Sequence, residues 1–360
     1  MSCDFIALAN QGVQKLSPYQ TGKPIDELKR ELGLDDIIKL ASNENPLGCS
    51  PLAIAAIQAE LKQVSLYPDG NGFNLKQAIQ QKFGFELNCI TLGNGSNDIL
   101  ELVARAYIAQ GESAVYSQHA FAVYPLAVQA VGGVGIEVSA KNFGHDLEAM
   151  AAAIQSNTKV VFIANPNNPT GTWFERHEFE QFMAQVPAHV LVVLDEAYVE
   201  YVTDVGFING FDYVKQYANL IVSRTFSKAY GLASLRVGYA IAAADVTNIL
   251  NRVRQPFNVN SFALAAATAA LQDESFVQQS RELNSAGMAQ LEQGLNSLAL
   301  GFIPSKGNFI AFDTGRPCLP VFQALLQQGV IVRPIANYGL PTYLRVSIGL
   351  ESENARFLAA

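Results

Sequence analysis

The sequence predicts an α/β fold, in which a large domain with a mostly parallel central sheet between helices is joined to a smaller α+β domain. Three observations support this prediction. The chain has 360 residues, a length that favours about two domains. Apolar residues make up 49% of it, which is enough for sizeable cores. Short β-branched runs alternate with helical patterns through the middle of the chain, and this rhythm changes after about residue 245.

Six apolar runs in the middle of the chain predict strands. Several are apolar on both faces, which is typical of a parallel sheet covered by helices on both sides. Helical patterns lie between them, for example at 145–154 and 175–186. The predicted strands are 114–117, 134–139, 159–166, 190–197, 219–226 and 238–242.

The two ends of the chain differ from the middle. A long helical region at 245–299 precedes shorter strand and helix patterns, which predicts the smaller α+β domain. The beginning is punctuated by Pro and Gly and predicts an arm plus a helix at IDELKRELG, packing with the small domain or with a partner subunit. The expected division is an N-terminal arm and helix at 1–40, a large domain at 41–250 and a C-terminal small domain at 251–360.

The composition argues against several classes of protein. The net charge is −8 with no basic tract, which argues against a nucleic-acid-binding surface. The start has no basic region followed by a long apolar run, so no signal peptide is expected. The alanine-rich stretch FALAAATAAL (262–271) is shorter than the roughly 20 residues of a membrane span, and it predicts a buried helix.

Cysteine and histidine usage predicts neither a disulfide framework nor a metal site. The four cysteines are widely separated and form no CxxC pair, so a reducing compartment, the cytoplasm, is the simplest interpretation. The four histidines are equally scattered, and none is expected to bind a metal.

The segment RTFSKAYGLASLRVGYA (224–240) concentrates positive charge. It contains three cations, no acid, and small or apolar residues between them. A solvated helix face would instead show scattered charges of both signs. The hydroxyl residues Thr225 and Ser227 come just before Lys228, and Arg236 follows eight residues after it. The segment therefore predicts a site for an anion, with one amine, Lys228, placed for chemistry.

The stretch ITLGNGSNDILELVARAYI (90–108) predicts a strand end, a glycine turn and a helix. We expect Ser96 to cap this helix, with Asp98 and Glu101 in its first turn. Glycines before a helix N-terminus allow backbone N–H groups to close on a phosphate. Taken alone, the stretch favours an ordinary glycine turn before a capped helix.

Two further strand ends carry polar residues. In IANPNNPTGTW (163–173), Asn168 either belongs to a turn or holds a ligand. In VLVVLDEAYVEY (190–201), Asp195 ends an apolar strand, where an unpaired carboxylate away from water would be costly. It caps a helix, pairs with an arginine or faces a cationic group of a ligand. Tyr198 follows at helical spacing, so both side chains can face one cavity.

These residues together describe a single ligand, because ligands lie beyond the carboxyl ends of the strands in doubly wound sheets. The ligand has a phosphate, a protonatable ring nitrogen, a ring oxygen and an electrophile for an amine. Pyridoxal 5'-phosphate has all four. We expect its phosphate on Gly95, Ser96, Asn97, Thr225, Ser227 and Arg236, its ring nitrogen on Asp195, its ring oxygen on Asn168 and Tyr198, and its electrophile on Lys228.

The chemistry of this cofactor requires each part. Lys228 would bond to the aldehyde carbon until a substrate amine displaces it. Asp195 would keep the ring nitrogen protonated, so that the ring accepts the electrons of the Cα carbanion. The freed Lys228 would then move a proton as a general acid–base, which requires a pKa well below that of a free lysine.

The order of the motifs resembles the aminotransferase family of fold-type I pyridoxal-phosphate enzymes. The motif T-x-S-K followed by GLASLRVGY, after NPNNPTG and LDEAY, carries the resemblance, which covers nearly the whole chain. It implies a fold-type I transferase with pyridoxal 5'-phosphate as cofactor, bound by the large domain at 41–250, in a homodimer with shared sites.

Within this family, the chain is most similar to the histidinol-phosphate aminotransferase subfamily. The similarity lies in LASNENPLG (40–48), LYPDG (66–70), LGNGSND (92–98), VIVRPI (330–335) and LRVSIG (344–349). It implies exchange of the amine of L-histidinol phosphate with 2-oxoglutarate. The products would be imidazole acetol phosphate and L-glutamate, formed by ping-pong chemistry in histidine biosynthesis.

The resemblance also implies roles for residues outside the cofactor motifs. Tyr67 would reach the cofactor phosphate of the neighbouring subunit, and Phe121 would stack on the cofactor. Arg345 would bind the anionic end of the substrate, a phosphate in this subfamily, with Arg333 as a helper. Asn43 and Tyr19 complete the expected substrate site, Tyr19 closing it from the arm. Simpler roles remain open for four of these residues: a turn aromatic for Tyr67, a core residue for Phe121, a surface ion pair for Arg333 and a structural arginine for Arg345.

Three positions depart from the family pattern. Asn97 stands where many relatives have Asp, which changes one charge near the phosphate. Ser234 stands where glycine is usual, and we expect an effect on packing only. Phe121 replaces a tyrosine found in some relatives, which keeps the stacking and loses any hydroxyl contact.

Other functions compatible with these motifs remain. One is a lyase on the same scaffold, similar to threonine-phosphate decarboxylase, because the choice of the bond that breaks is poorly visible in sequence. Another is an aromatic or broad-specificity aminotransferase. A cofactor-binding regulatory module without catalysis is disfavoured, because Lys228 is intact and no additional DNA-binding region is evident.

Overall fold

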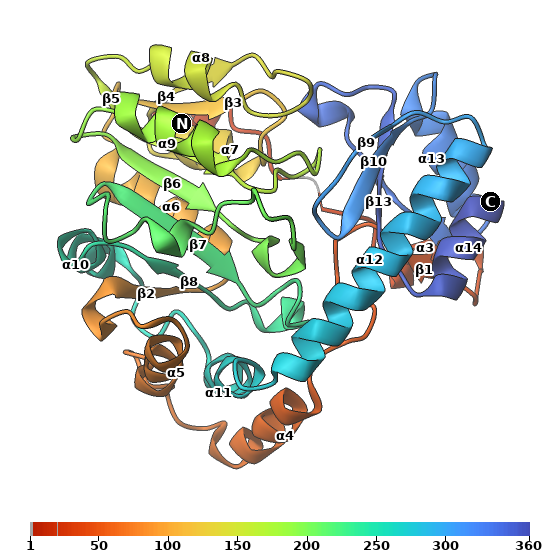
Figure 1. Cartoon of the computed structure of the whole chain (residues 1–360), viewed down its shortest axis with the longest axis horizontal. Coiled ribbons are helices and arrows are strands. Elements are labelled where there is room, and N and C mark those ends of the chain that lie inside the picture. Colours follow the sequence, from red (N-terminus) through yellow and green to blue (C-terminus); the bar gives the residue numbers. More distant parts are fainter. Residues whose placement is uncertain (1–2, 20) are drawn as a thin grey trace.

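A seven-stranded sheet forms the centre of the larger part of the chain (Figure 1). The structure is a computed structural model that describes residues 3–19 and 21–360. Within these residues the strand order is β2-β8-β7-β6-β5-β3-β4. β8 is antiparallel to β2 and β7, and the other neighbours are parallel. The strands are β2 (Ile90–Gly93), β3 (Ser113–Ser117), β4 (Val134–Val138), β5 (Thr158–Ala164), β6 (Leu191–Asp195), β7 (Leu220–Thr225) and β8 (Gly238–Ile241).

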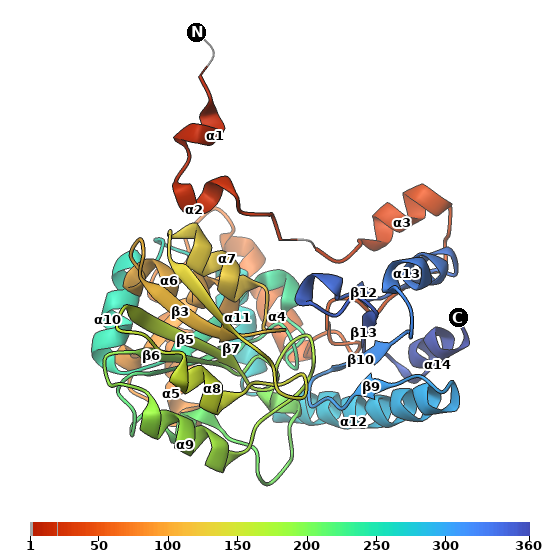
Figure 2. The same ribbon diagram turned by 90° about the horizontal axis from the view of Figure 1, so that it is seen from above.

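Helices cover both faces of this sheet (Figure 2). Along β5, Val161 and Ile163 belong to one apolar core and Val160 and Phe162 to the other, because successive side chains of a strand point to opposite faces. The first core includes residues of α4 (Pro51–Glu60), α5 (Phe73–Phe83), α8 (Leu147–Ala152), α9 (Arg176–Gln185) and α11 (Ser261–Ala270). The second includes residues of α6 (Ser96–Tyr107), α7 (Val123–Ala130) and α10 (Ala244–Val253).

A smaller sheet lies in the C-terminal part of the chain. Its order is β12-β13-β10-β9, and all neighbours are antiparallel. Its strands are β9 (Phe302–Ile303), β10 (Phe309–Asp313), β12 (Arg333–Pro334) and β13 (Tyr343–Ser347). Helices α12 (Glu274–Ser297), α13 (Cys318–Gln327) and α14 (Glu351–Ala359) contribute to a separate core with it. The long α12 runs from the larger part of the chain to this smaller one (Figure 1).

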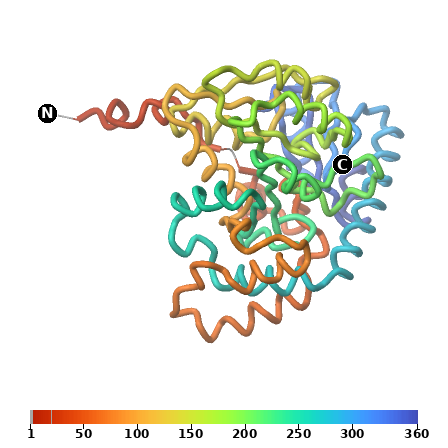
Figure 3. Tube along the Cα trace, turned by 60° about the vertical axis from the view of Figure 1, so that its left-hand side comes forward, coloured from red at the N-terminus to blue at the C-terminus, as the bar shows by residue number. Residues whose placement is uncertain are grey.

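The N-terminal segment contacts both parts. Strand β1 (Ile38–Lys39) pairs in parallel with β11 (Val330–Ile331), and Leu28 of α3 (Ile25–Leu32) packs against Ile331. Before α3, the short helices α1 (Phe5–Leu8) and α2 (Gln11–Gln14) extend from the body of the molecule (Figure 3). At α2 the backbones approach closely, because a Cβ on Gly12 would lie 2.0 Å from the carbonyl oxygen of Gln129.

The structure confirms the fold class and the six strands expected from the sequence, and it corrects two local predictions. Ser96 is not the N-cap of α6: Gly95 takes this position at φ 84, a conformation that glycine adopts without strain, and Glu101 lies beyond the first turn. The predicted helical region 245–299 is confirmed and contains three helices, α10, α11 and α12, since Asn260 and Asp273 each cap a new helix by accepting a backbone N–H. Within the described residues, no helix is both long and apolar enough to cross a membrane.

Candidate active site

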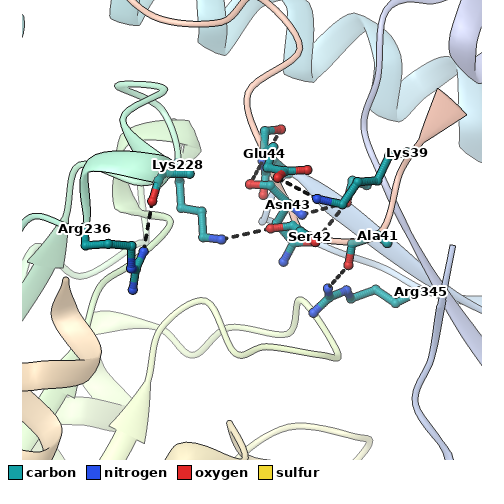
Figure 4. Close-up of polar contacts among 11 residues, drawn as sticks. Lys39, Ala41, Ser42, Asn43, Glu44, Lys228, Arg236 and Arg345 are labelled. Carbon is teal, nitrogen blue, oxygen red and sulfur yellow. Dashed lines mark hydrogen bonds and ion pairs between the residues drawn. The ribbon is translucent and has the colours of Figure 1, made fainter. Parts of the chain in front are cut away.

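A cavity of about 280 Å³ lies at the carboxyl ends of β5, β6 and β7. The N-terminus of α6 borders one side, and the segment 41–43 together with β12 and β13 borders the other. In Figure 4, the side chain of Lys228 points across towards Ser42, and Arg345 reaches Ala41 from the opposite side. The site residues predicted from the sequence that line this cavity are Tyr19, Asn43, Ser96, Asn97, Phe121, Asn168, Asp195, Tyr198, Thr225, Ser227, Lys228, Arg236, Arg333 and Arg345.

Lys228 is the amine of the cavity. It follows β7, and its Nζ donates a hydrogen bond to the carbonyl oxygen of Ser42 at 3.1 Å. Burial lowers the pKa of Lys228 to about 7, and repulsion from Arg345 and Arg236 adds to this shift, while Glu44 opposes it. At neutral pH a large share of this amine is therefore unprotonated, as a nucleophile or base requires.

Asp195 lies at the end of β6 and is 5% exposed. Tyr124 donates its hydroxyl to Oδ2 of Asp195 at 3.1 Å, whereas the buried Oδ1 has no hydrogen-bond partner within the described residues. Burial raises the pKa of Asp195 to about 7, the hydrogen bond from Tyr124 opposes this, Glu196 adds to it and Lys228 opposes it. An open carboxylate oxygen in a buried place is suited to a cationic N–H donor, since a charge-assisted hydrogen bond would satisfy it.

Tyr124 is a site residue that the sequence analysis missed. It lines the cavity, is fully buried, and its ring stacks on Phe162 at 5.1 Å between centroids. Phe121 lies edge-on to it at 6.0 Å. The available signal was the spacing of three residues from Phe121 in HAFAVY, which places both rings on one side of a helical turn.

A cradle for an anion forms around Arg236. Its Nη1 donates to Ser227 Oγ at 3.4 Å and to the carbonyl oxygen of Ala233 at 3.1 Å. Gly95 does not line the cavity itself but lies behind this guanidinium, because a Cβ on Gly95 would be 2.7 Å from Nη2 of Arg236. The first N–H groups of α6 and the hydroxyl of Thr225 complete a cluster of donors.

Two buried arginines lie on the opposite wall. Arg333 and Arg345 are register partners on β12 and β13, and they are 8% and 7% exposed. Arg345 donates to Oδ1 of Asn168 and to the carbonyl oxygen of Ala41, the latter at 2.8 Å. Burial lowers the pKa of Arg345. Because it is bonded to an amide and a carbonyl group instead of a carboxylate, its positive charge is available to an anion in the cavity.

Aromatic and amide side chains connect the two walls. Asn43 donates its Nδ2 to the hydroxyl of Tyr198 at 2.9 Å and is itself held by Ser347, whose Oγ accepts from the Asn43 backbone at 2.8 Å. The guanidinium of Arg333 lies 5.8 Å from the ring centroid of Tyr19. The hydroxyl of Tyr198 and the amide of Asn168 both face the cavity.

Tyr67 lies outside the cavity of its own chain. It is 83% exposed, and its ring stacks on Phe257 with the centroids 4.9 Å apart.

Within the described residues, no group of three or more His, Cys, Asp or Glu side chains is arranged to hold a metal ion.

A mostly parallel sheet with a buried lysine, an open aspartate and two separate arginine sites at one cavity is the arrangement expected of the pyridoxal-phosphate enzymes to which the aminotransferases belong. Residues 35–360 match the family described as aminotransferase class I and II, and the chain belongs to this family.

Comparison with individual proteins shows which members of the family the chain is similar to. The chain is 65% identical over 359 residues to histidinol-phosphate aminotransferase 2 of Pseudomonas aeruginosa, covering 99% of this chain and 97% of the relative. It is 54% identical to histidinol-phosphate aminotransferase 2 of Pasteurella multocida, covering 99% and 98%. Among solved structures it resembles the histidinol-phosphate aminotransferase of Sinorhizobium meliloti in complex with pyridoxal-5'-phosphate, with a TM-score of 0.90 and 27% identity over 97% of this chain and 95% of that one.

Proposed function

We propose that this protein is an aminotransferase that uses pyridoxal 5'-phosphate to exchange the amine of L-histidinol phosphate with 2-oxoglutarate. The products are imidazole acetol phosphate and L-glutamate, and the reaction belongs to histidine biosynthesis. The observation that carries the proposal is the cavity itself, in which Lys228 lies between two separate anion sites and near the open oxygen of Asp195. The full-length identity of 65% to a histidinol-phosphate aminotransferase supports the substrate.

The residues of the cavity fit the cofactor. The unpartnered Oδ1 of Asp195 suits the protonated ring nitrogen, and the cradle around Arg236 suits the phosphate. Tyr198 and Asn168 would hold the ring oxygen, and Phe121 would stack on the ring. The remaining phosphate ligands are Thr225, Ser227 and the backbone at Gly95, Ser96 and Asn97.

Lys228 performs the proton transfers. When bound, the cofactor supplies an electron sink for the carbanion at the substrate Cα. Lys228 Nζ would hold the aldehyde carbon of the cofactor and, once a substrate amine has taken its place, would carry a proton to and from the substrate Cα. Its pKa of about 7 suits both directions, because an acid–base group is most effective near the operating pH.

The arginines of the opposite wall select the substrates. Arg345, with Arg333 beside it, would bind the phosphate of histidinol phosphate and, in the second half-reaction, a carboxylate of 2-oxoglutarate. Since both anions need the same wall, the two substrates must occupy the site in turn, which is the ping-pong order. Asn43 orients Tyr198, and Tyr19 covers the site from the N-terminal arm.

We further propose a homodimer with shared sites, in which Tyr67 serves the cofactor phosphate of the partner subunit. The 83% exposure of Tyr67 supports this, as do several exposed apolar side chains close to it in the sequence. These are Leu47, Leu52, Ile54, Leu61, Val64, Leu66 and Phe73. The cytoplasm is proposed as its location because all four cysteines are free.

We propose that the chain forms two domains, each built around one of the two sheets and its own core. Along α12, Val277 belongs to the core of the large sheet, whereas Met288 and Leu291 belong to the core of the small sheet. Helix α3 and strand β1 would accompany the small domain, because β1 pairs with β11, whereas α2 lies against Gln129 of the large domain. We therefore propose a boundary between the large and small domains within α12, later than the residue 250 that the change of rhythm along the sequence predicts.

A single-turnover absorbance experiment tests the proposed function. Histidinol phosphate is added to the cofactor-loaded protein without any keto acid, and the absorbance band of the resting enzyme is followed. We expect this band to be replaced by that of the amine form of the cofactor and to return when 2-oxoglutarate is added.

Other outcomes would identify the competing functions. If only phenylalanine or another aromatic amine removes the band, the chemistry stands and the substrate is wrong. If no amine converts the cofactor and threonine phosphate releases carbon dioxide, the protein is a decarboxylase.

A further inference from the structure

A chain of polar contacts runs from the anion cradle to the loop that carries Tyr67. Asp98, in the first turn of α6, accepts the backbone N–H of Asn94 at 2.8 Å through Oδ2. The same oxygen accepts Nδ2 of Asn258 at 2.8 Å. Asn258 in turn accepts Nη1 of Arg254 at 2.7 Å through Oδ1. Arg254 completes the chain, since its Nη2 donates to the carbonyl oxygen of Gly70 at 2.9 Å.

Arg254 uses its whole guanidinium in these contacts. Nε donates to Oδ1 of Asn251 at 3.1 Å, so all three nitrogens have a partner. The partners are two amide oxygens and one carbonyl oxygen, and the fixed planar fork of arginine holds them at fixed relative positions. The last of them, Gly70, is three residues after Tyr67 in LYPDG.

Phe257 supports the same loop from its other side. Its ring stacks on Tyr67 at 4.9 Å, and a Cβ on Gly70 would lie 3.2 Å from that ring. The segment from Arg254 to Asn258 therefore holds the LYPDG loop by one hydrogen bond and by ring packing. Without the hydrogen bond from Arg254, this exposed loop would keep only local polar contacts, those that Asp69 accepts from the backbone of Asn71 and Phe73.

We propose that Arg254 is a positioning residue for the active site of the other subunit: it fixes the Tyr67 loop so that Tyr67 can reach the partner's cofactor phosphate. This inference rests on the proposed homodimer with shared sites. Loss of Arg254 leaves the contacts of Asp98 with Asn94 and Asn258 in place, so the cradle of its own subunit keeps its support. Loss of Arg254 is therefore expected to affect the active site of the partner subunit, that is, to act in trans.

Mixed dimers, purified with two affinity tags, distinguish an effect on the partner's active site (trans) from an effect on the same subunit's own site (cis). In the trans dimer, one subunit carries Lys228→Ala and Arg254→Met, and the other is unchanged. In the cis dimer, one subunit carries Lys228→Ala and the other Arg254→Met. Each dimer holds one copy of each substitution and one subunit with Lys228. A dimer with Lys228→Ala alone is the reference. Arg252→Met is the matched control, because Arg252 lies at an exposed position in the last turn of α10, two residues before Arg254, which is the C-cap of this helix.

The readout is cofactor affinity at the subunit that retains Lys228. Cofactor-free dimers are titrated with pyridoxal 5'-phosphate, bound cofactor is fixed to Lys228 with borohydride, and the mass of that subunit gives its occupancy. We expect the affinity of the trans dimer to fall about tenfold, as for the loss of one hydrogen bond to a charged group, and the cis dimer to match the reference. Equal loss in both dimers, loss in cis alone, or no loss in either would overturn the proposal.

Two further variants keep the test decisive. If Arg254→Met lowers the yield or the Tm, Arg254→Lys replaces it, because it keeps the charge and stem but cannot make the three contacts of the fork. Tyr67→Phe in the same two dimers tests the shared site itself. If Tyr67→Phe has no effect in trans, the shared site fails; if it acts in trans and Arg254→Met does not, only the role of Arg254 fails.

Discussion

Tyr124 donates a hydrogen bond to one oxygen of Asp195 at 3.1 Å and leaves the other oxygen without a partner in the part of the chain that the structure describes. The tyrosine therefore fixes the rotation of the carboxyl group and directs its open oxygen to the ligand. Its own ring is held by stacking on Phe162. The pair makes Asp195 a directed acceptor instead of a freely rotating charge.

The substitution Tyr124→Phe should weaken cofactor binding and lower kcat/KM by about tenfold, the cost of one hydrogen bond to a charged group. The pKa of Asp195 should rise further, because the hydrogen bond from Tyr124 opposes the effect of burial. The pH dependence of kcat/KM and a cofactor titration measure both effects. The Tyr217→Phe variant serves as a control, since Tyr217 stacks on Tyr213 and does not line the cavity. Identical pH profiles for the two variants would contradict the role of Tyr124.

The substitution Lys228→Ala should abolish turnover, with a loss of at least about 10³-fold, because both the covalent and the acid–base roles disappear. Borohydride treatment of the cofactor-loaded variant should fix no cofactor to the protein, as mass measurement would show. Cofactor fixed at another lysine would show that Lys228 is not the reacting amine.

The substitution Arg345→Gln should raise KM for both histidinol phosphate and 2-oxoglutarate. We expect roughly a 10- to 100-fold increase for each, because a hydrogen-bonded charge is lost at the wall that receives both anions. The two half-reactions, measured separately by absorbance, test this. An effect on one substrate only would mean that the second anion binds elsewhere. Arg316→Gln, at an exposed position of the small domain, is the control.

The buried carboxyl of Asp195 should make the stability of the cofactor-free protein depend on pH. Its pKa is raised from 3.8 to about 7 in the folded state, so between these values the folded protein binds more protons than the unfolded chain. Stability therefore falls as pH rises through this window, by up to about 1.4 kcal/mol per pH unit. Urea unfolding of the wild-type protein and of Asp195→Asn at pH 5 and pH 7 isolates the effect. The variant should show the smaller loss, and an equal loss in both proteins would contradict the shift.

Lys228 should have the opposite effect on stability at higher pH. Its pKa is lowered from 10.5 to about 7, so between these values the unfolded chain binds more protons and stability rises with pH. Unfolding of the cofactor-free Lys228→Met variant at pH 7 and pH 9 should show less of this rise than the wild-type protein. A rise of the same size in both would assign it to other groups.

The cofactor residues were accessible from sequence because several of them lie where apolar strands end, whereas the substrate residues came from the resemblance to a family. Asp195 closes β6, and Lys228 follows β7, so the patterns that predicted the strands also placed the side chains at one edge of the sheet. The partner of Asp195 was not accessible in this way. Tyr124 lies within a helical pattern, and periodicity gives its face but not which distant residue it meets.

Backbone conformation and long-range pairing account for the other differences. Ser96 has a good capping side chain, but the cap position needs φ 84, so Gly95 takes it. The pairing of β1 with β11 joins residues almost three hundred positions apart, and strands of two residues carry too short a pattern to be recognised. The antiparallel direction of β8 was equally hidden, since a short apolar run does not show how a strand is directed relative to its neighbours, here β2 and β7.

The segment from Ala41 to Asn43 holds the reacting amine and the anion-binding arginine through neighbouring main-chain atoms. The carbonyl of Ser42 accepts from Lys228, and that of Ala41 accepts from Arg345. Consecutive residues lie about 3.8 Å apart whatever their side chains are. The segment thus acts as a molecular ruler between the two functional groups. Because both contacts are made by main-chain carbonyl groups, the side chains at 41 and 42 can change while the spacing between Lys228 and Arg345 stays the same.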